Sequence, residues 1–178
     1  MGLVLALLMV MMQARGAQGQ GSAVKAIQFK NTLNTVLSNS ARWQKTIDDV
    51  DINSLPVAYS TGKIYEQNKT TLSQELKVIV LWAQRMQRED SLYGEVIFLS
   101  AVLDFQNQLE QLSYSILDAG VTDKTLQIKV TRWSDALVTL ANTTIDGLYK
   151  AAFTYTTDHA RRVDQTCSQT EPAAQQSR

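Results

Sequence analysis

The stretch "SLYGEVIFLSAVLDFQNQLEQLSYSILDAGVTD", residues 91–123, contains the clearest helical pattern in the chain. Its apolar stripe consists of Leu92, Val96, Leu99, Leu103, Leu109, Leu112 and Ile116. This spacing predicts one apolar face on an α-helix. After a short break at Asp90, Ser91 is suited to cap the helix at its amino end, and Gly120 is suited to end it. The segment therefore predicts a long amphipathic helix that packs against its neighbours along one stripe.

The following helix is predicted to begin at Thr122 or Asp123, because either side chain can cap it. Its apolar stripe consists of Leu126, Val130, Trp133, Leu137, Leu140, Ile145, Leu148, Ala152 and Tyr155. The segment "TTDHARRVD", residues 156–164, continues without further apolar spacing. We expect these residues to extend past the folded domain and to fray.

Two more helices are predicted in the first half of the chain. The first has Ser22 as its N-cap, and its stripe consists of Val24, Ile27, Leu33, Val36, Leu37, Trp43 and Ile47. The second begins somewhere between Ser60 and Thr71, and its stripe consists of Tyr65, Leu72, Leu76, Ile79, Ala83 and Met86. Pro56 cannot continue a helix, so residues 50–61 are predicted to form the connecting loop.

Four such helices predict an all-α fold, an antiparallel (up-down-up-down) four-helix bundle that spans residues 22–164. A helix of about thirty residues is about 45 Å long, so these helices can lie side by side with short connections. Trp43, Trp82 and Trp133 are expected in the core, because aromatic side chains bury large areas. The polar residues 165–178 are predicted to form a disordered tail.

The chain begins with an apolar run, residues 3–12. A membrane-spanning helix needs about 20 such residues, so the run is too short to span and instead fits the apolar core of a secretory signal peptide. Small residues would allow cleavage before Ala17 or before Gln20, although no Lys or Arg precedes the run. We expect residues 1–19 to be a cleavable signal peptide. The mature protein is then extracytoplasmic, either periplasmic or secreted, without a stable membrane span.

Few side chains of this sequence are suited to catalysis. The chain has 1 His and 1 Cys, which leaves few groups that can transfer protons or attack electrophiles near neutral pH. His159 is interpreted as a solvated surface residue on the fraying helix. The carboxylates interpreted as the solvated face of the helix after Ser91 are Glu95, Asp104, Glu110 and Asp118. We therefore expect no catalytic residue, no metal ligand and no cofactor.

The run "LKVIVLW", residues 76–82, is apolar on nearly all sides of its helix, which indicates deep burial or a covering partner. It predicts an interaction surface at Val78, Val80, Leu81 and Trp82. The lone Cys167 is interpreted as a bystander thiol, with an intermolecular disulfide as the alternative in an oxidising compartment.

These observations predict an exported, non-enzymatic bundle that acts through protein–protein interaction or self-association. The alternative is a bundle that binds an apolar small molecule between its helices near the tryptophans. Lys+Arg and Asp+Glu both number 17, so charge gives no argument for a nucleic-acid partner. Asn68 and Asn142 begin glycosylation sequons that matter only in a eukaryotic secretory pathway.

Overall fold

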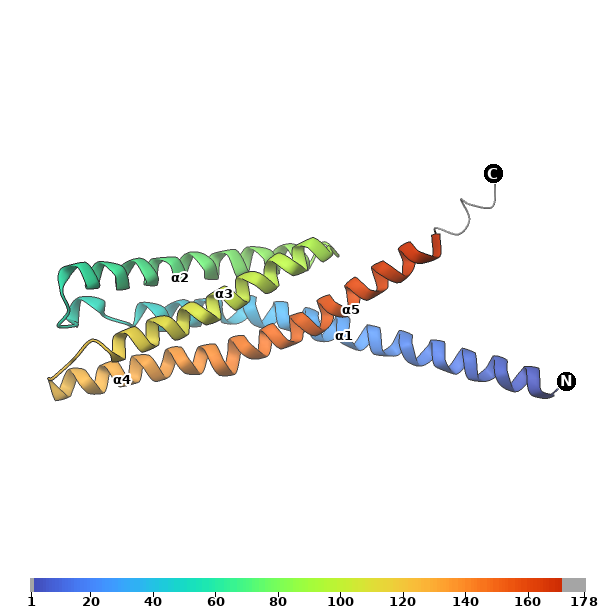
Figure 1. Ribbon diagram of the computed structural model, residues 1–178, viewed down its shortest axis with the longest axis horizontal. Coiled ribbons are helices and arrows are strands. Elements are labelled where there is room, and N and C mark those ends of the chain that lie inside the picture. The colour runs from blue at the N-terminus through green and yellow to red at the C-terminus, as the bar shows by residue number, and fades with distance from the viewer. Residues whose placement is uncertain (1, 171–178) are drawn as a thin grey trace.

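The computed structural model describes the backbone of residues 2–170 and the side chains of residues 21 and 23–166. The chain forms α1 (Gly2–Asp48), a short 3₁₀ turn η1 (Ile52–Ser54), α2 (Tyr59–Met86) and α3 (Leu92–Leu117). A last continuous helical segment consists of α4 (Lys124–Thr139), η2 (Leu140–Ile145) and α5 (Asp146–Thr170). Figure 1 shows the chain reversing direction at each connection, with α1 and α5 diverging at one end of the bundle. The predicted all-α four-helix bundle is confirmed, and the described backbone contains no strand.

Local capping chemistry sets three of the helix ends. The Ser91 hydroxyl accepts a hydrogen bond from the Gly94 N–H at 3.3 Å, as predicted for the start of α3. Asp123, rather than Thr122, caps α4, because its Oδ1 accepts from the Leu126 N–H at 2.8 Å. Gly120 follows α3 with φ +66°, the left-handed conformation that commonly ends a helix.

The connection between α1 and α2 is shorter than predicted. α2 begins at Tyr59, before the predicted range, and Ala58 precedes it without a side-chain cap. Lys69 of α2 reaches back to the carboxyl end of α1, where its Nζ donates to the carbonyl oxygens of Asp48 at 3.0 Å and Val50 at 2.7 Å. These bonds satisfy carbonyl groups that a helix end leaves without partners.

The buried stripe of α3 differs from the predicted one in its first half. The inward-facing residues of α3 are Glu95, Phe98, Val102, Phe105, Leu109, Leu112 and Ile116. Val96 is 51% exposed and Leu103 is 38% exposed, so the prediction was one position out of phase there. Apolar residues form two adjacent stripes on this half of α3. The stripe that contains Phe98 and Phe105 faces the interior of the bundle.

The first helix also departs from its prediction. α1 runs through Ser22 without a break, so Ser22 is not an N-cap. Val24 and Ile27 are more than half exposed, and burial in α1 begins at Phe29. The physical reason is visible in Figure 1, where the amino-terminal part of α1 extends away from the other helices.

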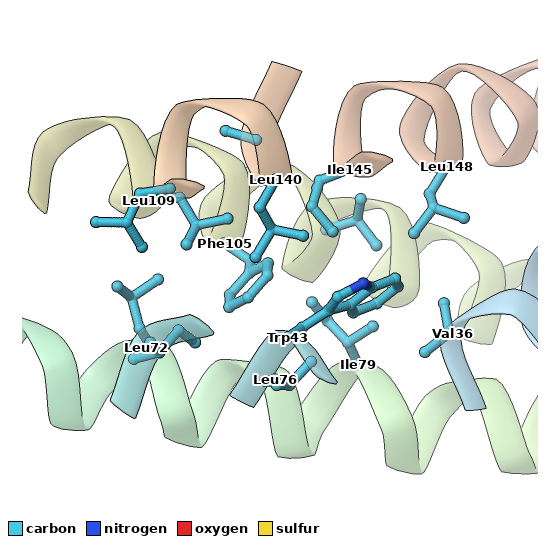
Figure 2. Close-up of a cluster of buried hydrophobic side chains, with 14 of the residues drawn as sticks. Val36, Trp43, Leu72, Leu76, Ile79, Phe105, Leu109, Leu140, Ile145 and Leu148 are labelled. Atoms are coloured by element: carbon cyan, nitrogen blue, oxygen red, sulfur yellow. The ribbon is translucent and has the colours of Figure 1, made fainter. Parts of the chain in front are cut away.

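Trp43 lies in the core, as predicted, at 4% exposure. Figure 2 shows its ring between α1, α2 and the last helical segment, close to Ile79, Leu140 and Ile145. Trp82 and Trp133 are only partly buried and pack against the edge of the core.

The last helical segment contains a π-helical turn, η2, that the periodicity did not indicate. Leu140 and Ala141 are successive residues and are both buried there. A π turn places an extra residue in the helix, which lets two neighbours face the core. α5 then continues to Thr170, so its last turns include residues 165–170 of the predicted tail, and the disorder of that tail remains a prediction. Residues 171–178 lie outside the described residues.

Candidate functional site

The four residues of the predicted interaction surface do not form one patch. Leu81 is 61% exposed and Val78 is 41% exposed, so both lie on the outer face of α2. Val80 lies toward α1 and lines a groove between the two helices. Trp82 packs instead against Gly94 of α3. We call Val78 and Leu81 the α2 ridge.

The groove beside the α2 ridge runs between α1 and α2. It is shallow, has a volume of about 460 Å³, and is lined by Ser40, Ala41, Gln44, Leu76, Lys77, Val80, Leu81 and Gln84. Half of its lining residues are apolar, and the polar ones include two glutamines and Lys77. Leu81 belongs to both the ridge and the groove. We call this feature the α1/α2 groove.

Other sequence-predicted positions are placed only in part. The backbone of Cys167 belongs to α5, but its side chain lies outside the described residues, so the thiol prediction remains a prediction. The backbone of residues 2–20 is part of α1, and the predicted cleavage of residues 1–19 also remains a prediction. Asn142 is exposed on η2 and Asn68 is half-buried on α2.

A buried polar cluster lies at the end of the bundle where α1 and α5 diverge. The Nδ1 atom of His159 on α5 lies 2.7 Å from Oε1 of Glu95 on α3. The same nitrogen lies 3.8 Å from Oδ1 of Asp90, in the turn before α3. The Glu95 side chain is 2% exposed, that of His159 15% and that of Asp90 76%. The cluster therefore extends from the core to the surface.

Aromatic rings surround the buried part of this cluster. Phe29 of α1 stacks on Tyr155 of α5 with ring centroids 4.4 Å apart, and it meets Phe98 of α3 edge-on at 6.3 Å. Burial in this apolar setting raises the pKa of the Glu95 carboxyl above its ordinary value. The hydrogen bond and charge of His159 and, last in size, the Thr156 hydroxyl oppose that shift, and the charge of Asp90 adds to it.

One carboxylate oxygen of Glu95 lacks a hydrogen bond of good geometry. This atom, Oε2, is buried, and the Thr156 hydroxyl lies close enough to the carboxyl to lower its pKa. The hydroxyl of Thr156, one turn before His159 on α5, is also buried without a hydrogen bond of good geometry. A buried carboxylate oxygen without a partner is costly and therefore uncommon in folded proteins.

The sequence interpretation of these residues was wrong in two respects. Glu95 belongs to the core stripe rather than to a solvated face, and His159 is packed rather than fraying. A signal was present in each case. Glu95 stands three residues before Phe98 and seven before Val102, in the phase of the buried stripe. His159 stands four residues after Tyr155 and continues the stripe of the last helix.

Two further hollows involve polar side chains. One, of about 460 Å³, adjoins Trp43 and is lined by residues of α1 and of the α4–η2 segment, most of which are polar. The other lies between α2 and α3, where Gln108 donates to Glu75 Oε1 at 2.5 Å. Burial, and then the charge of Asp104, raise the pKa of Glu75. The prediction of an apolar ligand near the tryptophans thus remains a prediction.

No protein-family model, curated protein or solved structure matches this chain. Within the part of the chain that the structure describes, no helix is both long enough and apolar enough to cross a membrane.

Proposed function

We propose that this chain is an exported, non-enzymatic bundle that self-associates through the α2 ridge and the α1/α2 groove. The observation that carries the proposal is the 61% exposure of Leu81 at the boundary between an apolar ridge and an apolar groove. When a partner covers a leucine with this exposure, the free energy falls, because apolar surface is removed from water.

The proposed occupant of the groove is a second copy of the same chain, because an apolar ridge and an apolar groove lie next to each other on one surface. Ridge and groove lie side by side on α2, with Leu81 common to both. In an isologous dimer, a twofold rotation would bring the ridge of each copy to the groove of the other. Ala41 is the small residue that gives an incoming side chain room between α1 and α2.

Leu81→Arg is the variant that tests this interface. Each dimer loses two leucine contacts, and burying one leucine contributes about 1.5 kcal/mol at the lower end of the usual range. The dissociation constant of the dimer should therefore rise roughly a hundredfold. Ile128→Arg is the matched control, because Ile128 is 55% exposed on α4 and does not line the groove.

Sedimentation velocity of the full chain over a range of concentrations measures the outcome. The wild type and Ile128→Arg should sediment as dimers of a 19.8 kDa chain, and Leu81→Arg as a monomer with an unchanged circular dichroism spectrum. A monomeric wild type at every concentration, or a Leu81→Arg protein that still dimerises, would show that this surface is not a self-association site.

Export is tested separately, by intact mass spectrometry of the product in each cell fraction. We expect a product that begins at Ala17 or Gln20 and is found outside the cytoplasm. A full-length cytoplasmic product would refute export and leave the dimer proposal untouched.

A further inference from the structure

We propose that Asp90, Glu95 and His159 form a binding site for a divalent transition-metal ion. Each residue offers one ligand atom, and these three atoms lie within 4.8 Å of one another. The observation independent of this grouping is the buried Oε2 of Glu95, which makes no hydrogen bond of good geometry although the Thr156 hydroxyl lies close to this carboxyl.

The distances in the cluster suit a shared ion. Protein oxygen and nitrogen ligands lie about 2.0–2.2 Å from such a metal, so two ligands at a tetrahedral angle are about 3.4 Å apart. His159 Nδ1 lies 2.7 Å from Glu95 Oε1 and 3.8 Å from Asp90 Oδ1, and these separations bracket that value. Side-chain rotations that move these two atoms apart by about 0.7 Å open the shorter contact.

The ligand types indicate the class of ion. One imidazole nitrogen with two carboxylate oxygens suits Zn²⁺, Co²⁺ or Mn²⁺. Two carboxylates and a neutral imidazole also balance the charge of a divalent ion, which matters because Glu95 is 2% exposed. Asp90, with 76% of its side chain exposed, gives the ion a path from solvent and leaves room for water ligands.

Metal binding replaces the hydrogen bond between His159 Nδ1 and Glu95 Oε1. The imidazole nitrogen that binds the metal carries no proton, so a neutral His159 binds through Nδ1 and keeps its proton on Nε2. Because Glu95 belongs to α3 and His159 to α5, the ion joins these two helices at the end of the bundle where α1 and α5 diverge. The ion therefore stabilises the fold, and the site needs no catalytic role.

The test uses the untagged full chain with Cys167→Ser, so that no thiol competes for metal. Metal-free protein is titrated with Co²⁺, whose visible absorption reports its coordination, and with Zn²⁺ in a calorimeter. One equivalent of metal should bind per chain, and the melting temperature should rise with metal concentration. His159→Ala should abolish the spectrum and the rise in melting temperature.

Asp90→Asn is the variant that keeps the fold, because Asp90 is mostly exposed. It should weaken metal binding by roughly tenfold or more, whereas the control Asp104→Asn, on the exposed face of α3, should leave binding unchanged. The proposal is overturned if neither ion binds at millimolar concentration. It is equally overturned if His159→Ala and Asp90→Asn bind as tightly as the Cys167→Ser parent.

Discussion

The close approach of α2 and α3 at Gly94 supports a quantitative prediction. A Cβ atom at Gly94 would lie 3.2 Å from Cζ3 and 3.5 Å from Cε3 of Trp82, and 3.7 Å from Cγ of Met86. The first of these distances is shorter than an ordinary van der Waals contact, so Gly94→Ala must displace the Trp82 ring or separate the two helices. Gly62 is the matched control, because it also lies in the first turn of its helix and its added Cβ would meet only Val57, at 3.7 Å.

The magnitude follows from two opposing contributions. Replacing glycine by alanine inside a helix stabilises it by at most about 1 kcal/mol, and somewhat less in a first turn. Overpacking a well-filled contact costs about 1–3 kcal/mol. Gly62→Ala should therefore raise the free energy of unfolding by up to about 1 kcal/mol, whereas Gly94→Ala should lower it by about 0–2 kcal/mol.

Urea denaturation followed by far-ultraviolet circular dichroism measures both variants. The difference between them, about 1–3 kcal/mol, is the cost of the Trp82 contact. In a Trp82→Leu background the Gly94→Ala penalty should largely disappear, because the smaller side chain leaves room for the methyl group. If Gly94→Ala stabilises the protein as much as Gly62→Ala does, the two helices do not pack as described.

Three further predictions concern the cap, the core and the buried carboxyl. Asp123→Ala should destabilise the fold by about 0.5–2 kcal/mol, because the Leu126 N–H loses its acceptor. Thr122→Ala should have little effect. Equal losses of unfolding free energy in urea denaturation would contradict the assignment of the cap. Phe105→Ala should lower the unfolding free energy by about 3–5 kcal/mol, since the ring is fully buried. A loss below about 1 kcal/mol would show that Phe105 is not part of a tightly packed core. Burial raises the pKa of Glu95 in the folded chain above 4.5, so the folded state holds this proton more tightly than the unfolded state does. The stability that this proton contributes is fully present below pH 4.5, the ordinary pKa of the group. It is lost as the pH rises through the raised pKa of the folded state. The Gln side chain of Glu95→Gln cannot ionise. In metal-free urea denaturation between about pH 4 and about pH 8, the unfolding free energy of this variant should therefore depend less on pH than that of the wild type. An equal dependence on pH would contradict the raised pKa.

Most helix ends could be predicted because they depend on chemistry within a few residues. The cap at Ser91, the left-handed Gly120 and the break at Pro56 each act on the backbone beside them. The buried stripe of α2 was also predictable, because its apolar positions recur at helical spacing along the whole segment, even though residues 76–82 are apolar on nearly all sides. Where a local rule left two choices, as between Thr122 and Asp123, only the hydrogen bond in the folded chain decided between them.

The sequence by itself thus determined the fold class, the number of long helical segments and most of their boundaries. Tertiary packing decided which of two adjacent stripes of α3 faces inward, how Val80 and Trp82 are separated from the α2 ridge, and where η2 widens the last helix. It also joined Glu95 to His159, which are 64 residues apart. Helical periodicity reports only which residues share a face of one helix. A contact between two helices depends on their relative rotation and offset, which are set by the packing of every side chain between them.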